Sequence, residues 1–530
     1  MEQTINNDAT VEPITDIITE PLQTDAPATE PPATEPPATE PPATEPPATE
    51  PPATEPPATE PPATESPETE TPETEPAAPE YVDDGIVDGA AYFVKNASLA
   101  LACTTFGTIN GEAAKMSVID GDLDSIWYFE RQTDGTYMIR SAVCGYYLSV
   151  KGSSPNDGVS IALYNPAKSQ GQHWRAVVTD NGYLLQCAES GGYLGNAVQT
   201  TSEASAVVWN IELAASPDTV LPRVLALRGA VKAPASCPEI IKYNGIYYNI
   251  NMTGGMKIKS SKDLITWSNV ATVFNTKPSW IKTELGYDGI WAPGYYIVGG
   301  KLRIYYCASD SGQRNSLIGL VDCKTPTSGF VDRGMVIRSY KNSQQVSPYN
   351  CIDPNIFEES DGRVYLVWGS YAEGIYMQRI DPETGMLHKT DTKQYRIADA
   401  PEGMEAPYLI KRGDYYYLFV AMGGLKKGTY YWAVGRSDSL FGPYLDKQGR
   451  PMLSGNTSRL TEWKDGIQGV GHAQPFLDDD GQWYMVSESW VDRSVQSPPI
   501  QLHISTIVWN EAGWPVTAIS SNLLGELAEK

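Results

Sequence analysis

The chain has 530 residues and a formal net charge of −26, but this charge is unevenly distributed. Residues 1–80 contain 19 acidic residues and no lysine or arginine, which leaves a net charge of −7 on the remaining 450 residues. This mildly acidic part carries no basic stripe that would bind phosphates, so no nucleic-acid partner is expected, and its length exceeds one typical core, which predicts two or more domains.

Residues 1–85 are predicted to form a disordered spacer rich in proline, threonine and glutamate. The repeat ATEPP dominates this segment, and proline fixes φ while almost no apolar side chain is available for burial. Acidic spacers of this kind typically tether secreted or surface enzymes. No apolar run in the chain approaches the ~20 residues that span a bilayer, and no secretory apolar segment follows Met1. We therefore expect a secreted or cell-surface protein whose signal peptide is not present in this sequence.

Residues 88–214 are predicted to form a β-trefoil. Three similar strand-rich units begin 45 and 46 residues apart, and each closes on a tryptophan: Trp127, Trp174 and Trp209. Units this small cannot bury their own apolar faces and must pack around a common axis. They resemble the ricin-type β-trefoil, whose units end on Gln-x-Trp, although only QHW keeps the glutamine. We expect the tryptophans to fill the core rather than to bind sugar, in a module that resembles carbohydrate-binding domains.

Residues 225–525 are predicted to form a five-bladed β-propeller. Five hairpins carry a glycine turn followed by an aromatic strand: YNGIYYNI, VGGKLRIYY, SDGRVYLVW, KRGDYYYLF and DDGQWYMVS. Their turn glycines lie 51 to 68 residues apart, and each follows a proline by six to eight residues. Short strands and glycine turns repeated at this spacing predict blades around a channel. The fold class is therefore predicted to be all-β.

The residues beside these five prolines are expected to meet in one funnel, because proline is tolerated at the first residue of a strand. They are Cys237, Glu239, Trp291, Asp353, Glu405 and His472. Separated carboxylates with an aromatic side chain and a histidine are typical of carbohydrate hydrolysis. In that chemistry one carboxyl protonates the leaving oxygen and another deprotonates water.

The same stretch resembles glycoside hydrolase family 43, and most of all its endo-arabinanases. The runs that carry the resemblance are KIKSSKDLITW, YDGIWAP, NCIDPNIFEESDGRVYLVWGSY, MEAPYLIKRGDYYYLFV and GVGH. The resemblance implies inverting hydrolysis of a plant cell-wall polysaccharide, namely arabinan or a related arabinoside or xyloside. It also implies a lectin-targeted enzyme without an organic cofactor, and we expect a monomer, alone or within a larger surface-attached protein.

Individual roles follow from the resemblance where the motifs match. Glu405 corresponds to the general acid and Asp353 to the carboxylate that adjusts the pKa of that acid. His472 corresponds to the histidine at the channel centre, which implies a nearby calcium ion. Substrate contacts are implied for three residues: Trp291, Tyr371 and Asp288.

The sequence departs from the family at the position of the general base. Aligning SCPEI with the His-Asp-Pro phrase of the family places Cys237 where the aspartate stands, and a mostly protonated thiol activates water poorly. Glu239, two residues further along the strand, is a possible surrogate base. Gly294 stands where the arabinanases usually have aspartate, and SESW replaces a histidine-containing strand. Two functions therefore remain open: an active hydrolase, or a catalytically impaired propeller that only binds glycan.

Overall fold

The computed structural model describes residues 84–106, 109–167, 171–230, 236–310, 314–342, 344–424, 429–464, 466–490 and 500–530. The predicted spacer lies almost entirely outside the described residues. The described part is built from strands with two short helices, α1 (Ser279–Leu285) and α2 (Leu523–Leu527), so the all-β prediction is confirmed. None of the helices in these ranges is long and apolar enough to cross a membrane.

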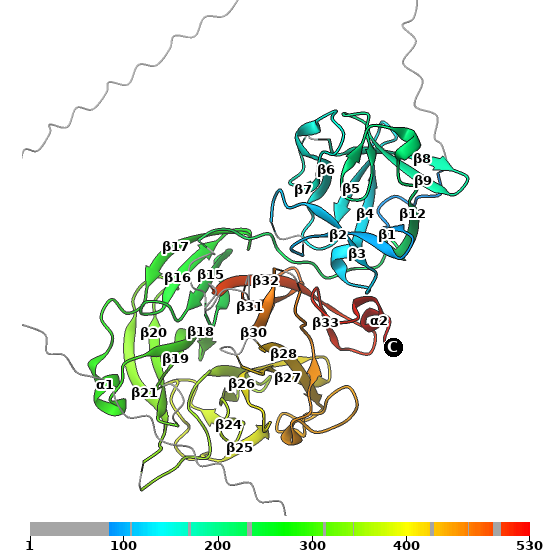
Figure 1. Cartoon of the computed structure of the whole chain (residues 1–530). Coiled ribbons are helices and arrows are strands. Elements are labelled where there is room, and N and C mark those ends of the chain that lie inside the picture. The colour runs from blue at the N-terminus through cyan, green and yellow to red at the C-terminus, as the bar shows by residue number, and fades with distance from the viewer. Residues whose placement is uncertain are drawn as a thin grey trace, which may run out of the picture. The chain divides into compact units, whose positions relative to one another are not determined.

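The first domain is a closed barrel of six strands with three hairpins at one end (Figure 1). Its strands are β1 (Ala91–Asn96), β2 (Leu99–Cys103), β3 (Ala114–Val118), β4 (Ile126–Arg131), β5 (Tyr137–Ser141), β6 (Tyr147–Val150), β7 (Ile161–Tyr164), β8 (His173–Thr179), β9 (Gly182–Cys187), β10 (Tyr193–Leu194), β11 (Gln199–Thr200) and β12 (Asn210–Ala215). Strand β1 pairs with β4 and β12, and the ring continues through β5, β8 and β9. A bridge between Tyr183 and Trp209 closes it. This arrangement confirms the β-trefoil.

The three repeat tryptophans fill the core of the trefoil, as predicted. Trp127, Trp174 and Trp209 are all fully buried. Each indole N–H donates to a backbone carbonyl at 2.9–3.0 Å, and the three acceptors are leucines in equivalent positions of the repeats. A buried indole needs such an acceptor, since an unpaired buried donor costs about 1–3 kcal/mol. These three side chains are therefore structural and are not available to stack on sugar.

The second domain consists of five sheets, each made from four consecutive antiparallel strands (Figure 1). Blade 1 contains β14 (Glu239–Tyr243), β15 (Ile246–Asn251), β16 (Lys257–Ser261) and β17 (Thr266–Thr272). Blade 2 contains β18 (Ile290–Val298), β19 (Lys301–Ser309), β20 (Ser316–Cys323) and β21 (Val331–Ser339). Blade 3 contains β22 (Asn355–Glu358), β23 (Val364–Trp368), β24 (Ile375–Ile380) and β25 (Gln394–Ala398). Blade 4 contains β26 (Met404–Arg412), β27 (Tyr415–Met422), β28 (Tyr431–Ser437) and β29 (Ser458–Arg459). Blade 5 contains β30 (Gln468–Leu477), β31 (Trp483–Trp490), β32 (Ile500–Trp509) and β33 (Pro515–Thr517).

The segment before blade 1 joins the two ends of the propeller. Val224 forms a bridge with Ser505 on β32, so this segment extends blade 5. A few residues later, β13 (Arg228–Gly229) pairs in parallel with β17 of blade 1. One short segment thus hydrogen-bonds to the first and last blades and closes the ring without a strand exchanged between blades.

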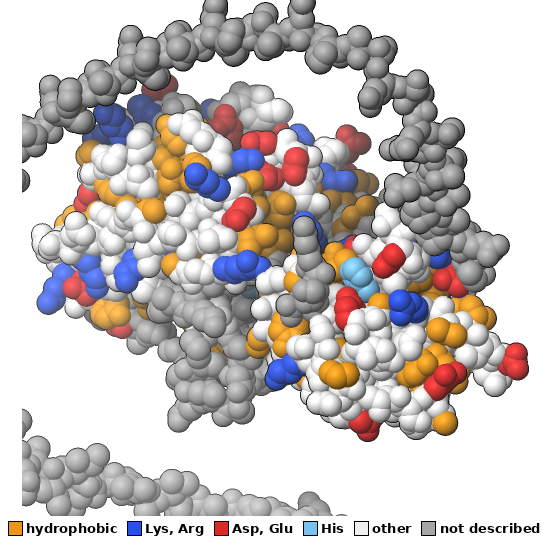
Figure 2. All heavy atoms as spheres, turned by 90° about the horizontal axis from the view of Figure 1, so that it is seen from above, with side chains coloured by type: hydrophobic (Ala, Val, Ile, Leu, Met, Phe, Trp, Pro, Cys, Tyr) orange, Lys and Arg blue, Asp and Glu red, His pale blue; other side chains and the backbone are white. Residues whose placement is uncertain are grey.

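Buried polar side chains also link neighbouring blades. Arg303 of blade 2 is 1% exposed and donates to the carbonyls of Pro382 and Glu383 in blade 3 at 2.7 and 2.6 Å. Glu359 of blade 3 accepts hydrogen bonds from Lys411 and Tyr416 of blade 4. On the face seen in Figure 2, acidic and basic side chains are interspersed over the surface.

Candidate active site

One residue at the start of the inner strand of each blade adopts a left-handed backbone conformation. The five residues, with φ between 37° and 55°, are Ala292, His472, Ala406, Cys237 and Asp353. Non-glycine residues rarely adopt positive φ, and such residues cluster at functional sites. In blades 2, 4 and 5 the pairing register also shifts at this point, as in a β-bulge. The shared conformation aligns the five blades residue by residue.

This alignment corrects the one based on prolines in blade 5. In the first four blades a proline directly follows the left-handed residue, as Pro238 follows Cys237. In blade 5 the residue after His472 is Ala473, and Pro475 comes three residues after the histidine. The alignment based on prolines is therefore out of register in blade 5. The expectation that His472 lies in the funnel is nevertheless correct.

Two further layers of side chains follow from the alignment. The residues just before the left-handed positions are Ser236, Trp291, Ile352, Glu405 and Gly471. The residues two positions after them are Glu239, Gly294, Asn355, Tyr408 and Gln474. The two sets stand three residues apart on each inner strand, which is about 10 Å along an extended strand. Glu405 and Glu239 therefore belong to different depths of the channel.

Glu405 is held by two hydroxyl groups. The hydroxyl of Tyr430 donates to Oε1 at 2.7 Å, and Ser370 Oγ donates to Oε2 at 2.8 Å. Burial raises the pKa of the Glu405 carboxyl, and these two hydrogen bonds oppose the rise. Gly471 makes room for the tyrosine, because a Cβ at this position would lie 2.3 Å from the Tyr430 ring. A carboxyl with a raised pKa that is fixed in orientation is suited to donate a proton.

Asp353 interacts electrostatically with Glu405. Its carboxylate accepts a hydrogen bond from the backbone N–H of Ala406 at 3.1 Å, so it lies beside the residue that follows Glu405. Burial raises the pKa of Asp353 well above its usual range, and the charge of Glu405 raises it further. Two carboxyls that repel each other in a buried site cannot both ionise readily, so the ionisation of one opposes that of the other.

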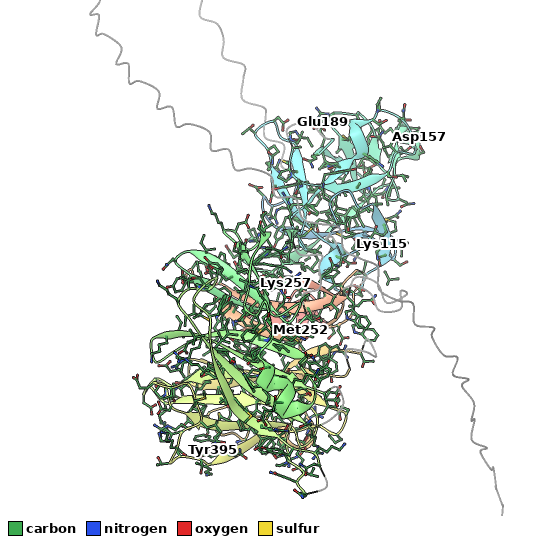
Figure 3. All side chains as sticks on the ribbon, turned by 90° about the vertical axis from the view of Figure 1, so that its left-hand side faces the viewer. Lys115, Asp157, Glu189, Met252, Lys257 and Tyr395 are labelled. Atoms are coloured by element: carbon green, nitrogen blue, oxygen red, sulfur yellow. The ribbon has the colours of Figure 1, made fainter. Side chains whose placement is uncertain are left out.

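Cys237 places a buried thiol at the start of the inner strand of blade 1. Burial raises the pKa of this thiol well above its usual range, and the charges of Glu488 and Asp353 add to the rise. Its sulfur lies 3.8 Å from the sulfur of Met252, which Figure 3 labels within blade 1. The thiol is therefore protonated near neutral pH and cannot accept a proton from water.

Glu488 brings a carboxylate next to Cys237. It lies on β31, is 1% exposed, and its Oε2 accepts the backbone N–H of Cys237 at 2.9 Å. Its strand partner is Gly471 on β30. Burial raises the pKa of Glu488 to about 8, with a contribution from the charge of Glu405.

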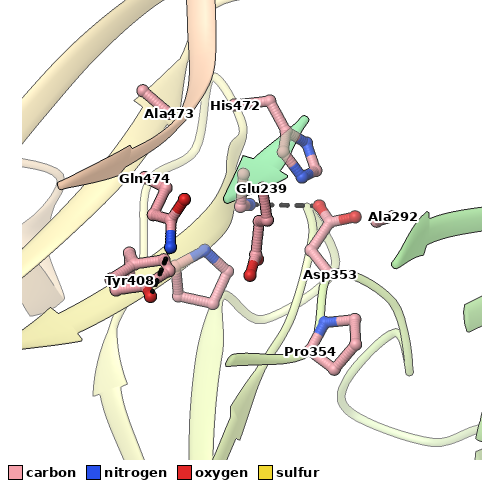
Figure 4. A pocket seen from close by; sticks show the side chains of 10 residues that line it. Glu239, Ala292, Asp353, Pro354, Tyr408, His472, Ala473 and Gln474 are labelled. Atoms are coloured by element: carbon pink, nitrogen blue, oxygen red, sulfur yellow. Dashed lines mark hydrogen bonds between the residues drawn. The ribbon is translucent and has the colours of Figure 1, made fainter. Parts of the chain in front are cut away.

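Next to these groups lies a small pocket in the channel (Figure 4). Its lining includes Glu239, Asp353, Tyr408, His472 and Gln474. Figure 4 shows Glu239 between Gln474 and Asp353. Burial lowers the pKa of His472 to about 4, so its imidazole is neutral. Glu239 accepts a hydrogen bond from Tyr296 at 2.9 Å, while its buried Oε2 has no partner among the described residues.

The three residues expected to contact substrate have different surroundings. Trp291 is half-buried in the same layer as Glu405. Tyr371 is 43% exposed and its hydroxyl donates to the carbonyl of Gly423 at 2.9 Å, while burial and the charge of Glu405 raise its pKa. Asp288 is half exposed and pairs with Lys277 at 3.4 Å, so its recorded contacts do not reach the funnel.

Comparisons with known proteins agree with this geometry. The sequence profile described as glycosyl hydrolases family 43 matches residues 231–515, more than half of the chain. The chain belongs to glycosyl hydrolase family 43. A second profile, described as a ricin-type β-trefoil lectin domain-like family, matches residues 123–209.

Relatives within family 43 are named as arabinan-degrading enzymes. The chain is 31% identical to an extracellular exo-α-(1→5)-L-arabinofuranosidase of Cellvibrio japonicus over 312 residues, which are 54% of this chain and 87% of that protein. It is 34% identical to an extracellular endo-α-(1→5)-L-arabinanase of Bacillus subtilis over 264 residues, 47% of this chain and 79% of that protein. Among solved structures, an endo-arabinanase from Bacillus licheniformis is 31% identical with a TM-score of 0.50, covering 55% of this chain and 99% of that one.

Sequence reasoning missed Glu488, although a signal for it exists. Counting seven residues from the turn glycine of each hairpin reaches Met252, Cys307, Gly369 and Glu488 in blades 1, 2, 3 and 5. These positions lie on the second strand of blades 2 and 5 and directly after it in blades 1 and 3. Glu488 is the one carboxylate among them.

Proposed function

We propose that this chain hydrolyses α-1,5-linked arabinan or a related arabinoside or xyloside of plant cell walls, with inversion at the anomeric carbon. The observation that supports this most directly is the environment of Glu405. Its carboxyl has a raised pKa, is oriented by Tyr430 and Ser370, and is followed by the residue whose N–H binds Asp353. The names of the relatives point to the same substrate.

In the proposed reaction Glu405 donates its proton to the oxygen of the leaving sugar. Asp353 places a negative charge or a hydrogen-bonding group close to the acid. The pKa of Glu405 thereby stays raised, and its proton remains available. Trp291 and Tyr371 are proposed to flank the bound sugar, because half-exposed aromatic faces at the rim of a funnel suit the apolar faces of sugar rings.

The trefoil is proposed to bind glycan and so to keep the propeller near its polymer. The enzyme is proposed to act as a secreted or cell-surface monomer, in line with the extracellular relatives. Calorimetry measures the binding of isolated oligosaccharides to the full chain, and a pull-down measures its binding to polymer. Comparison of the two separates capture by the trefoil from binding in the funnel.

A calcium ion is proposed in the channel, close to His472. The donors there fit a hard cation held with several waters, because the unpartnered Oε2 of Glu239 faces the same cavity as a neutral imidazole. Such an ion would supply positive charge beneath the carboxyls. Addition of calcium after chelation should raise the melting temperature of the parent and not that of a His472→Ala variant.

The test of hydrolysis is reducing-sugar release from debranched arabinan by the parent and by Glu405→Gln. We expect the parent to be active and the variant to lose activity by at least a hundredfold, since a general acid contributes roughly 10²–10⁴-fold. Product anomers followed by NMR should show inversion. A parent that binds arabino-oligosaccharides but releases no sugar would instead identify a glycan-binding propeller, the alternative that Cys237 raises.

A further inference from the structure

Inverting hydrolysis requires a second carboxylate besides the acid. This base takes a proton from water, and it stands about 6.5–9.5 Å from the acid so that the water fits between the base and the sugar. The inference below rests on the proposed hydrolysis. Three described carboxyls other than Glu405 lie in the funnel or against it: Glu239, Asp353 and Glu488.

Asp353 and Glu239 are poorly placed for this role. Asp353 is bound to the N–H of Ala406, next to the acid itself, and therefore lies on the side of the proton donor. Glu239 is in the deeper layer and is held by Tyr296. Its Oε2 is packed so closely against Gly294 that a Cβ there would lie 2.3 Å away. Asp353 is thus held beside the acid, and Glu239 lies deeper in the pocket that both carboxyls line together with His472.

Glu488 lies at the required level. It pairs with Gly471, which occupies the same layer as Glu405 in the propeller repeat. Its carboxylate touches the backbone of Cys237, the position that matches the family's base. The charges of Glu405 and Glu488 both raise the pKa of Tyr430, and the charge of Glu405 also raises the pKa of Glu488. The two carboxyls therefore share one buried environment.

We propose that Glu488 is the general base of this enzyme and replaces the aspartate that is absent at Cys237. In the proposed step, Glu488 removes a proton from a water molecule while the water oxygen bonds to the anomeric carbon. The glycosidic carbon–oxygen bond breaks at the same time, and the leaving oxygen takes the proton of Glu405. After product release, Glu488 returns a proton to solvent and Glu405 regains one, so the cycle is balanced.

The electrostatics give this base a characteristic pH dependence. The groups that interact with it are Glu405 and the Tyr430 hydroxyl from blade 4, Asp353 from blade 3 and the Cys237 thiol from blade 1. With a pKa of about 8, Glu488 is mostly protonated at neutral pH, so activity should rise with pH until this group ionises. A carboxylate that ionises near pH 8 is a stronger base than an ordinary one.

The deciding variants are Glu488→Gln, Glu488→Ser and the double variant Cys237→Asp/Glu488→Ser. Glutamine still accepts the N–H of Cys237, so the local fold is retained while basicity is lost. We expect Glu488→Gln to lower kcat on debranched arabinan by about 10²–10⁴-fold with little change in KM. Formate or azide should partly restore Glu488→Ser, and the double variant should recover activity because it returns a carboxylate to the first blade.

The outcomes separate this inference from the proposed function. An active parent that Glu405→Gln abolishes but Glu488→Gln leaves unchanged would overturn the role of Glu488 and keep the hydrolase. A drop in activity without rescue by formate, azide or Cys237→Asp would reduce Glu488 to a structural support and also overturn the inference. A parent with no activity would overturn both this inference and the proposed function. If Cys237→Asp alone then gains activity, the parent has no working base.

Discussion

The hydroxyl of Tyr430 should set the pH at which the proposed acid loses its proton. It donates to Glu405 Oε1 at 2.7 Å, and a hydrogen bond donated to the charged form stabilises the carboxylate. The change Tyr430→Phe removes this bond and keeps the ring that packs against Gly471. A hydrogen bond to a charged group contributes about 1.5–3 kcal/mol, and one pKa unit corresponds to about 1.36 kcal/mol. The pKa of Glu405 should therefore rise by roughly one to two units.

The sign of the effect follows from the role of the acid. Glu405 must be protonated to act, so a higher pKa preserves the active form to higher pH. The falling alkaline limb of kcat/KM should move upward in Tyr430→Phe by about one to two pH units, although kcat itself should decrease as the carboxyl loses one of its two orienting contacts. The measurement is kcat/KM on debranched arabinan as a function of pH.

Tyr408→Phe is the matched control. Tyr408 lines the same channel, but its hydroxyl contacts Gln474 rather than Glu405. Its loss should leave the alkaline limb in place. An alkaline limb that stays fixed, or moves to lower pH, in Tyr430→Phe would refute the assignment of that limb to Glu405.

Three further predictions concern packing and acid stability. Gly294→Ala should destabilise the propeller by about 1–3 kcal/mol in denaturant unfolding, because its Cβ would overlap the carboxyl of Glu239 and the hydroxyl of Tyr296, and the added variant Glu239→Ala should relieve only the part that comes from the carboxyl. Arg303→Lys should cost about 2–4 kcal/mol, since a lysine cannot reach the same set of carbonyls in blade 3. Burial alone would raise the pKa of Glu359, but hydrogen bonds from Tyr416 and Lys411 outweigh it and lower the pKa to about 2. Its contribution is therefore present above about pH 4.5 and lost as pH falls towards 2, so the stability difference between parent and Glu359→Gln should shrink over that range.

Repetition made most of the fold predictable from the sequence. The three tryptophans and the five glycine turns recur at fixed intervals, and each interval reflects a unit that must pack against copies of itself. The same repetition located Glu405, Asp353 and His472, because each stands at the start of an inner strand.

The base site could not be predicted in this way. Glu488 lies on a second strand, and which side chain of that strand faces the funnel depends on bulges that shift the register between Gln468, Gly471 and Gln474. A shift of one residue would turn the carboxylate to the other face of the sheet. The glycine count works in four blades, but in blade 4 the equivalent Ala421 comes eight residues after Gly413, so counting alone gives no fixed rule.

The departures from the family pattern occur in pairs, and this bears on whether the site is intact. Cys237 lacks the family's carboxylate, and Glu488 of the neighbouring blade places one against its backbone. Gly294 also lacks the carboxylate usual in arabinanases, and the Oε2 of Glu239 from the adjacent blade occupies the space that a side chain there would fill. Burying carboxyls is costly, so a propeller relieved of catalysis would be expected to lose them without replacement. Each of the two positions instead has a buried carboxyl of the neighbouring blade packed against it, as expected where hydrolysis still requires ionisable groups.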